Sequence, residues 1–247
     1  MKCDACHCNS RSLESFKFVS EGDIHIMWYP SAFSQSKLGN ENAEGSNACT
    51  IIVLLIATKI RNSNTRVQCL FSSPTKETLV KLFSDAILEG NSIHRNLFKA
   101  GLLRNVNLTV PEAMAASKSS LGSMTEWKSS VYFNDIMKNL YKEMDYHILE
   151  WFKNPPCCNK NSLYMVLIAH SKSVLFVLQL DMNCVLLIDS HQHSPYGAMM
   201  SQVRISKLES LCLWYTDMLC SSIGSKPDAY ELSFLYYKCG KRNSIGV

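Results

Sequence analysis

The sequence lacks the features that mark membrane proteins, secreted proteins and nucleic-acid-binding proteins. Its longest apolar run, CTIIVLLIA at 49–57, is too short to cross a bilayer, and no apolar core of a secretory signal follows Met1. The net charge of +4 is spread along the chain without a dense basic block. We therefore expect a soluble protein of the cytoplasm or nucleus that binds neither membranes nor nucleic acid.

A disulfide framework and internal repeats are also not indicated. The 11 cysteines are an odd number in a chain without a secretory signal, so most of them are expected to be reduced thiols. Hydrophobic residues make up 47% of the 247 residues, which is enough for a sizeable core. We expect a flexible, cysteine-rich segment at 1–22, followed by one domain at 23–247.

The first half of this domain is dominated by helix signals. The run ACTIIVLLIATKI at 48–60 is apolar on all sides and follows two candidate caps, Ser46 and Asn47. It predicts a helix in the middle of the core. Further signals are an alternating strand at 24–29, a Ser-Pro helix start at 73–74, a capping box at 109–112 and a four-residue apolar repeat over 136–152.

The second half is dominated by strand signals. Three apolar runs separated by short polar turns predict a meander of buried antiparallel strands at 163–169, 173–180 and 184–189. A final helix is expected at about 201–221, and a last strand at 230–238. The serine-containing stretch 117–130 is expected to be a surface loop. Helices followed by strands indicate an α+β domain.

Asp189 and His191 stand at the end of the apolar run VLLID. In an extended strand their side chains point to the same side, so the carboxylate can orient the imidazole. A charged residue directly after four apolar ones also needs a partner, because an unpaired buried carboxylate is costly. The alternative is a simple turn, in which these residues only end the strand.

Cys49 stands at the head of the predicted buried helix. Backbone N–H groups and the helix dipole favour an anion there, so the pKa of the thiol is expected to fall. A neighbouring imidazole would lower it further, and the same helix end can supply oxyanion donors. The alternative is a buried structural thiol, the common fate of an intracellular cysteine.

The segments GSNACT and LLIDSH together resemble the papain-like ubiquitin-specific proteases of herpesvirus large tegument proteins. This resemblance implies a papain-like α+β fold with a central helix packed on an antiparallel sheet. It implies Cys49 as nucleophile, His191 as general base and Asp189 as the orienting carboxylate. It also implies an oxyanion-donating glutamine before the nucleophile, a role for which Gln35 is the candidate.

The activity that the resemblance implies is hydrolysis of a peptide or isopeptide bond at the C-terminus of ubiquitin or a ubiquitin-like modifier. No metal or organic cofactor is required, and ubiquitin is the expected partner. Two alternatives stay open: an inactive module of the same fold that binds ubiquitin or another protein, and a cysteine acyltransferase of similar layout.

Two further ambiguities concern histidines and cysteines. His170 precedes Asp189 by a hairpin's length, so it could be the base in place of His191, with Asp189 as its orienting group. His193 lies on the same side as His191 if the strand continues. The segment CDACHC at 3–8 could hold zinc or haem, or be an unstructured thiol-rich terminus; we expect the last.

Overall fold

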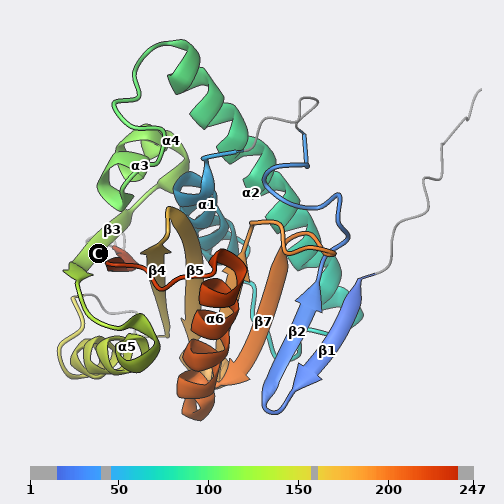
Figure 1. Ribbon diagram of the computed structural model, residues 1–247. Coiled ribbons are helices and arrows are strands. Elements are labelled where there is room, and N and C mark those ends of the chain that lie inside the picture. The colour runs from blue at the N-terminus through green and yellow to red at the C-terminus, as the bar shows by residue number, and fades with distance from the viewer. Residues whose placement is uncertain (1–15, 40–45, 157–160, 239–247) are drawn as a thin grey trace, which may run out of the picture.

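The computed structural model describes residues 16–39, 46–156 and 161–238. Its middle layer is an antiparallel sheet of eight strands (Figure 1). From one edge to the other, the strands are β1 (Lys17–Glu21), β2 (Ile24–Trp28), β7 (Met199–Arg204), β6 (Cys184–Asp189), β5 (Lys172–Gln179), β4 (Ser162–Ala169), β8 (Tyr230–Tyr237) and β3 (Met124–Tyr132).

Helices cover both faces of this sheet (Figure 1). One face carries α1 (Cys49–Asn62), α2 (Ser73–Lys99), α3 (Val110–Ala116) and α4 (Lys118–Leu121). The other face carries α5 (Ile136–Lys153) and α6 (Leu208–Ile223). The predicted α+β architecture, with a central helix packed on an antiparallel sheet, is therefore confirmed.

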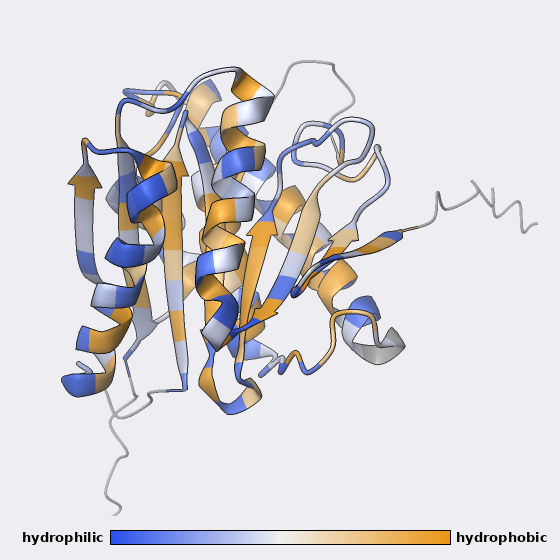
Figure 2. Ribbon diagram, turned by 60° about the horizontal axis from the view of Figure 1, so that its bottom comes forward, coloured by the Kyte–Doolittle hydropathy of each residue, from blue (hydrophilic) through white to orange (hydrophobic). Residues whose placement is uncertain are grey.

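The central strands are buried on both sides, which explains their continuous apolar runs (Figure 2). Alternate residues of each strand enter different cores. In β5, Val177 packs in the core under α1, whereas Phe176 packs in the core under α5 and α6. The three predicted strands of the meander are confirmed at 162–169, 172–179 and 184–189.

Helix α1 is buried almost all round because it lies between the sheet and α2. Gly90 of α2 allows this close packing, since a Cβ there would press into the side chain of Ile52. The other expected helix signals are also confirmed: α2 begins at Ser73, Thr109 and Glu112 form a capping box, and α5 spans 136–153.

Two sequence expectations about the strands of the sheet were wrong. The final helix was expected from about residue 201, but residues 199–204 form β7 and the helix begins only at Leu208. Their burial on both faces removes the alternation that marks a strand. The expected loop at 117–130 contains α4 and most of β3. Its polar composition reflects an edge strand that pairs with β8 and exposes one face.

The N-terminal boundary also differs from the expectation. Residues 17–21, which the sequence places in the flexible segment, form β1 and pair with β2. The folded domain therefore begins before residue 23. Residues 1–15, including the CDACHC segment, lie outside the described residues. Within the described ranges, every helix is either too short or too polar to span a membrane.

Candidate active site

Cys49 is the first residue of α1 and is only 3% exposed. The N-cap is Ala48, so neither Ser46 nor Asn47 caps the helix as the sequence predicts. Instead, the Ser46 hydroxyl accepts a hydrogen bond from the Ala48 N–H at 3.2 Å. No side chain in the described part of the chain caps α1, and its first-turn N–H groups remain beside the thiol, where they favour an anion.

His191 and Asp189 meet through a turn and not through an extended strand. Strand β6 ends at Asp189, and Oδ1 of Asp189 accepts hydrogen bonds from His191 N at 2.8 Å and His191 Nδ1 at 2.6 Å. The expected strand geometry was therefore wrong, although the expected pairing is present. The turn and the pairing, which the sequence poses as alternatives, are one feature: the carboxylate that closes the turn also holds the imidazole.

The thiol of Cys49 and the imidazole of His191 lie close enough that each shifts the pKa of the other. Because Nδ1 of His191 donates to Asp189, its Nε2 is the atom left for the sulfur. The structure thus brings Cys49, His191 and Asp189 together in one chain of contacts, at a buried position between α1 and the end of β6.

The electrostatics of these three groups favour a thiolate–imidazolium pair. Burial raises the pKa of the Cys49 thiol, but the hydrogen bond and charge of His191, with a contribution from Ser173, bring it below its ordinary value. Burial lowers the pKa of His191, but Asp189 and Cys49 raise it to about 10. The pKa of Asp189 lies well below its ordinary value: burial raises it, and His191 and His193 lower it by more.

Asp189 has further partners that the sequence does not single out as such. Oδ2 faces His193 Nε2 at 3.1 Å, and the carboxylate also helps to raise the pKa of Tyr215 in α6, after burial as the main cause. The His193 ring is in turn packed edge-on against Trp28, with ring centroids 5.5 Å apart. A carboxylate that is 1% exposed is therefore satisfied by several donors, as a buried charge requires.

Ser173, at the start of β5, lies on the other side of the sulfur. Cys49 Sγ is 3.6 Å from its hydroxyl and 3.8 Å from the Ser171 carbonyl oxygen. The Thr50 hydroxyl donates to the Leu108 carbonyl at 2.7 Å and lies 2.8 Å from the Ser173 hydroxyl. Ser173 is a buried polar residue at the start of an apolar run. That position is the sequence signal by which it could have been found as a neighbour of Cys49.

His170 does not join this cluster. Its Nε2 lies 3.1 Å from the Ser225 carbonyl oxygen, beyond the end of α6. Both oxygens of Asp189 contact other imidazoles, those of His191 and His193. The geometry therefore favours His191 over His170 as the partner of the thiol.

Gln35 is buried beside the segment that leads into α1. Its side-chain Nε2 donates to the Ser46 carbonyl at 2.7 Å, and its Oε1 accepts from the Ser190 hydroxyl at 2.7 Å. The loop that carries it is joined to the His191 loop, because Gln35 N donates to Ser190 O at 2.8 Å. A side chain at Gly197 would collide with the carbonyl oxygens of Pro30 and Phe33, so this contact between the two loops requires glycine.

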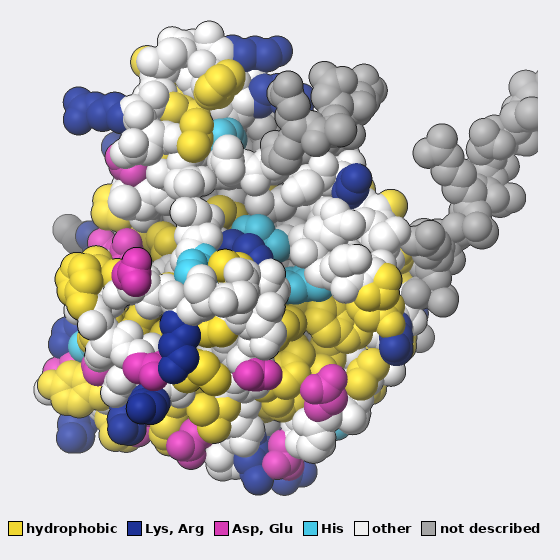
Figure 3. All heavy atoms as spheres, in the orientation of Figure 1, with side chains coloured by type: hydrophobic (Ala, Val, Ile, Leu, Met, Phe, Trp, Pro, Cys, Tyr) yellow, Lys and Arg dark blue, Asp and Glu magenta, His cyan; other side chains and the backbone are white. Residues whose placement is uncertain are grey.

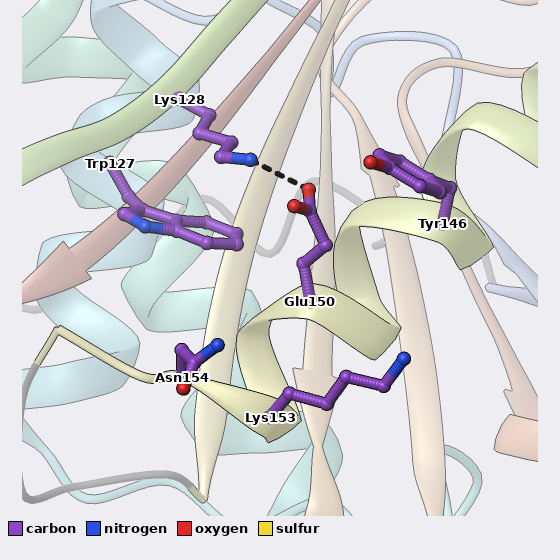
Figure 4. Close-up of a pocket in the computed structure, with 6 residues that line it drawn as sticks. All are labelled: Trp127, Lys128, Tyr146, Glu150, Lys153 and Asn154. Carbon is purple, nitrogen blue, oxygen red and sulfur yellow. Dashed lines mark hydrogen bonds and ion pairs between the residues drawn. The ribbon is translucent and has the colours of Figure 1, made fainter.

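Histidine side chains gather near the middle of the face shown in Figure 3, beside one end of α6. A separate surface depression of about 430 Å³ lies between β3 and α5 (Figure 4). An ion pair of 2.6 Å between Lys128 and Glu150 crosses it, and none of its lining residues belongs to the Cys49 cluster. Within 16–39, 46–156 and 161–238, no cluster of His, Cys, Asp and Glu could hold a metal ion.

No family model matches the chain, and no curated protein matches it. Among solved structures, it is similar to the ubiquitin-specific protease encoded by the murine cytomegalovirus tegument protein M48, in complex with a ubiquitin-based suicide substrate. The TM-score is 0.52 at 8% identity, over 90% of this chain and 89% of that chain. The chain has a papain-like fold. The fold resemblance that the two short motifs predicted is thereby confirmed.

A second similar structure is that of the Pseudomonas avirulence protein AvrPphB. Its TM-score is 0.48 at 10% identity, over 77% of this chain and 92% of that chain.

Proposed function

We propose that this papain-like protein is a cysteine peptidase that cleaves the bond after the C-terminal residue of ubiquitin or a ubiquitin-like modifier. The observation that carries the proposal is the arrangement at the N-terminus of α1: the His191 imidazole is held by the buried Asp189 carboxylate and interacts electrostatically with the Cys49 thiol. A thiolate, a proton carrier and its orienting carboxylate are the parts that thiol hydrolysis needs.

In the acylation step, the Cys49 thiolate attacks the scissile carbonyl carbon, and the carbonyl electron pair moves onto oxygen. The tetrahedral intermediate collapses as the C–N bond breaks, and the His191 imidazolium gives its proton to the leaving amine. A thioester to Cys49 and a free amine result. Asp189 keeps the imidazole aimed at the sulfur throughout, because it accepts from both His191 N and Nδ1.

In the deacylation step, His191 takes a proton from water as the water oxygen attacks the thioester. The second intermediate collapses with release of the carboxylic acid and the Cys49 sulfur. Both intermediates carry a negative oxygen near the N-terminus of α1. The first-turn N–H groups of α1 and the Gln35 amide are the donors that we assign to it.

The substrate class is supported by the similar fold that was determined with a ubiquitin-based suicide substrate. The test is a ubiquitin probe with a C-terminal electrophile. Wild-type protein should form a covalent adduct, and Cys49→Ala should form none. Cys69→Ala is the matched control, because Cys69 is an exposed thiol outside the centre; it should react like wild type.

Three other outcomes would contradict the proposal. An adduct that persists in Cys49→Ala would place the reactive thiol elsewhere. Binding of ubiquitin without any adduct would indicate an inactive module. Transfer of the acyl group to an added amine in preference to water would indicate an acyltransferase.

A further inference from the structure

Asn91 is a buried polar residue on the apolar stripe of α2. The stripe runs through Leu79, Phe83 and Ile87 at four-residue spacing, and Asn91 is the next position. Asn91 is only 7% exposed, and both ends of its amide are bonded. Its Nδ2 donates to the Gln35 carbonyl oxygen at 2.9 Å, and its Oδ1 accepts from the Ser46 hydroxyl at 2.6 Å.

This amide joins the two segments that flank the candidate oxyanion position. The Ser46 hydroxyl has a single proton, which it donates to Asn91, so its oxygen is oriented to accept from the Ala48 N–H. Ala48 is the N-cap of α1. Asn91 therefore orients the Ser46 hydroxyl, and this hydroxyl binds the backbone N–H of the residue directly before Cys49.

The side-chain amide of Asn91 also holds the backbone of Gln35. Asn91 holds the Gln35 backbone carbonyl, while Ser46 and Ser190 hold the two ends of its side-chain amide. The network thus connects α2, the entry to α1, the Gln35 loop and the end of β6. Gln35 and Ser190 are 2% and 0% exposed, so solvent cannot replace a lost partner.

We propose that Asn91 is a positioning residue: it holds Gln35 and the N-terminus of α1 in the relative placement at which both donate to the oxyanion. This inference rests on the proposed function. In it, Asn91 acts through Gln35 and Ser46, and the thiolate–imidazolium pair is set by other residues. Loss of Asn91 should weaken donors that matter only when the oxyanion forms.

The expected result for Asn91→Ala is a fall in kcat of about tenfold to a hundredfold on a fluorogenic ubiquitin substrate, with KM unchanged. Affinity for ubiquitin aldehyde, which forms a tetrahedral adduct, should fall by a similar factor. The pH limits of the reaction should stay in place. Asn96→Ala is the matched control, because Asn96 lies exposed on the same helix; its kinetics should equal those of wild type.

A double-mutant cycle with Gln35 separates positioning from general destabilisation. If Asn91 acts through Gln35, then Asn91→Ala should cost little more in a Gln35→Ala background. Asn91→Asp gives a second measure, since it keeps the acceptor for Ser46 and loses the donor to Gln35. If Asn91→Ala does not fold, Asn91→Asp carries the same kinetic test. A kcat within about twofold of wild type, or losses that add fully in the double mutant, would overturn the proposal.

A second readout does not depend on activity. If wild type does not react with ubiquitin probes, the proposed function is refuted, but the positioning role of Asn91 is not. Hydrogen exchange of the Gln35 side-chain amide then decides on Asn91: slow exchange in wild type and fast exchange in both Asn91 variants support positioning. Equal exchange in wild type and variants overturns it.

Discussion

His170 and His191 each lie just beyond a buried strand, and both segments reach the Cys49 sulfur, but their surroundings differ. The segment after β6 offers the sulfur an imidazole that is backed by a buried carboxylate. The turn after β4 offers it the Ser171 carbonyl and the following start of β5 offers the Ser173 hydroxyl, while the His170 ring hydrogen-bonds to the Ser225 carbonyl.

In the proposed mechanism, the difference between the two histidines is the buried carboxylate that backs His191. Asp189 holds its own neighbour by accepting from both the backbone and the ring of His191. His170 and Ser171 instead adopt φ values of 50° and 58°, which reverse the chain between β4 and β5. We therefore assign the proposed proton transfer to the first segment, whereas the second reverses the chain and places Ser171 and Ser173 beside the sulfur.

The largest effect is expected from the two histidine variants compared directly. His191→Ala should lower kcat/KM on a fluorogenic ubiquitin substrate by about a thousandfold, because proton transfer and thiolate stabilisation are both lost. His170→Ala should stay within about threefold of wild type. The opposite ranking would indicate that His170, in the β4–β5 turn, is the base.

The next effect concerns the carboxylate. Asp189→Asn should lower kcat/KM by about a hundredfold, because the amide neither stabilises the imidazolium nor fixes its tautomer. The pKa of His191, followed by NMR titration, should fall from about 10 in wild type. An unchanged His191 titration would show that Asp189 does not control the base.

The same variant should change stability in acid. The pKa of Asp189 is depressed in the folded state, so its pairing adds stability above the ordinary value of 3.8, and this is lost as the pH falls through the folded value. Wild type should therefore lose more free energy of unfolding between pH 5 and the acid limit than Asp189→Asn, measured by denaturant unfolding at each pH. Equal acid sensitivity of the two proteins would contradict this assignment.

A smaller effect is expected on the turn side. Ser173→Ala removes a contact that lowers the pKa of Cys49, so the thiol should titrate at a higher pH than in wild type. Alkylation of Cys49 by iodoacetamide at neutral pH should slow by about threefold to tenfold, because less thiolate is present. The upper pH limit of turnover should stay near 10, since His191 sets it. If the upper pH limit shifts and the alkylation curve does not, then Ser173 acts on His191 and not on the Cys49 thiol.

The smallest effect on activity is expected from the backbone of the turn. His170→Val should lower the free energy of unfolding by about 1–2 kcal/mol, because a β-branched residue is strained at positive φ. His170→Asn should be close to neutral, since asparagine tolerates that conformation. Denaturant unfolding would measure both, and equal stability of the two variants would show that the turn geometry is not what limits residue 170.

Patterns read along the chain predicted much of the fold. The buried helix at 48–60, the amphipathic stripe at 136–152 and the three central strands each carry their signal within one segment. Strands β7 and β3 escaped prediction because pairing with neighbours far along the chain decides them. β7 has no alternation, being buried on both faces, and β3 is polar because it lies at an edge.

By itself, the sequence determined which residues carry reactive groups and in what local setting: Cys49 before an apolar helix, and Asp189 and His191 after an apolar strand. Only the tertiary structure decided that the sulfur interacts with His191 and not with His170, that Ser173 lies beside the sulfur, and that Asn91 holds the Gln35 backbone. The physical reason is that a helix or strand forms from neighbours along the chain, whereas hydrogen bonds between buried groups depend on how separate elements pack.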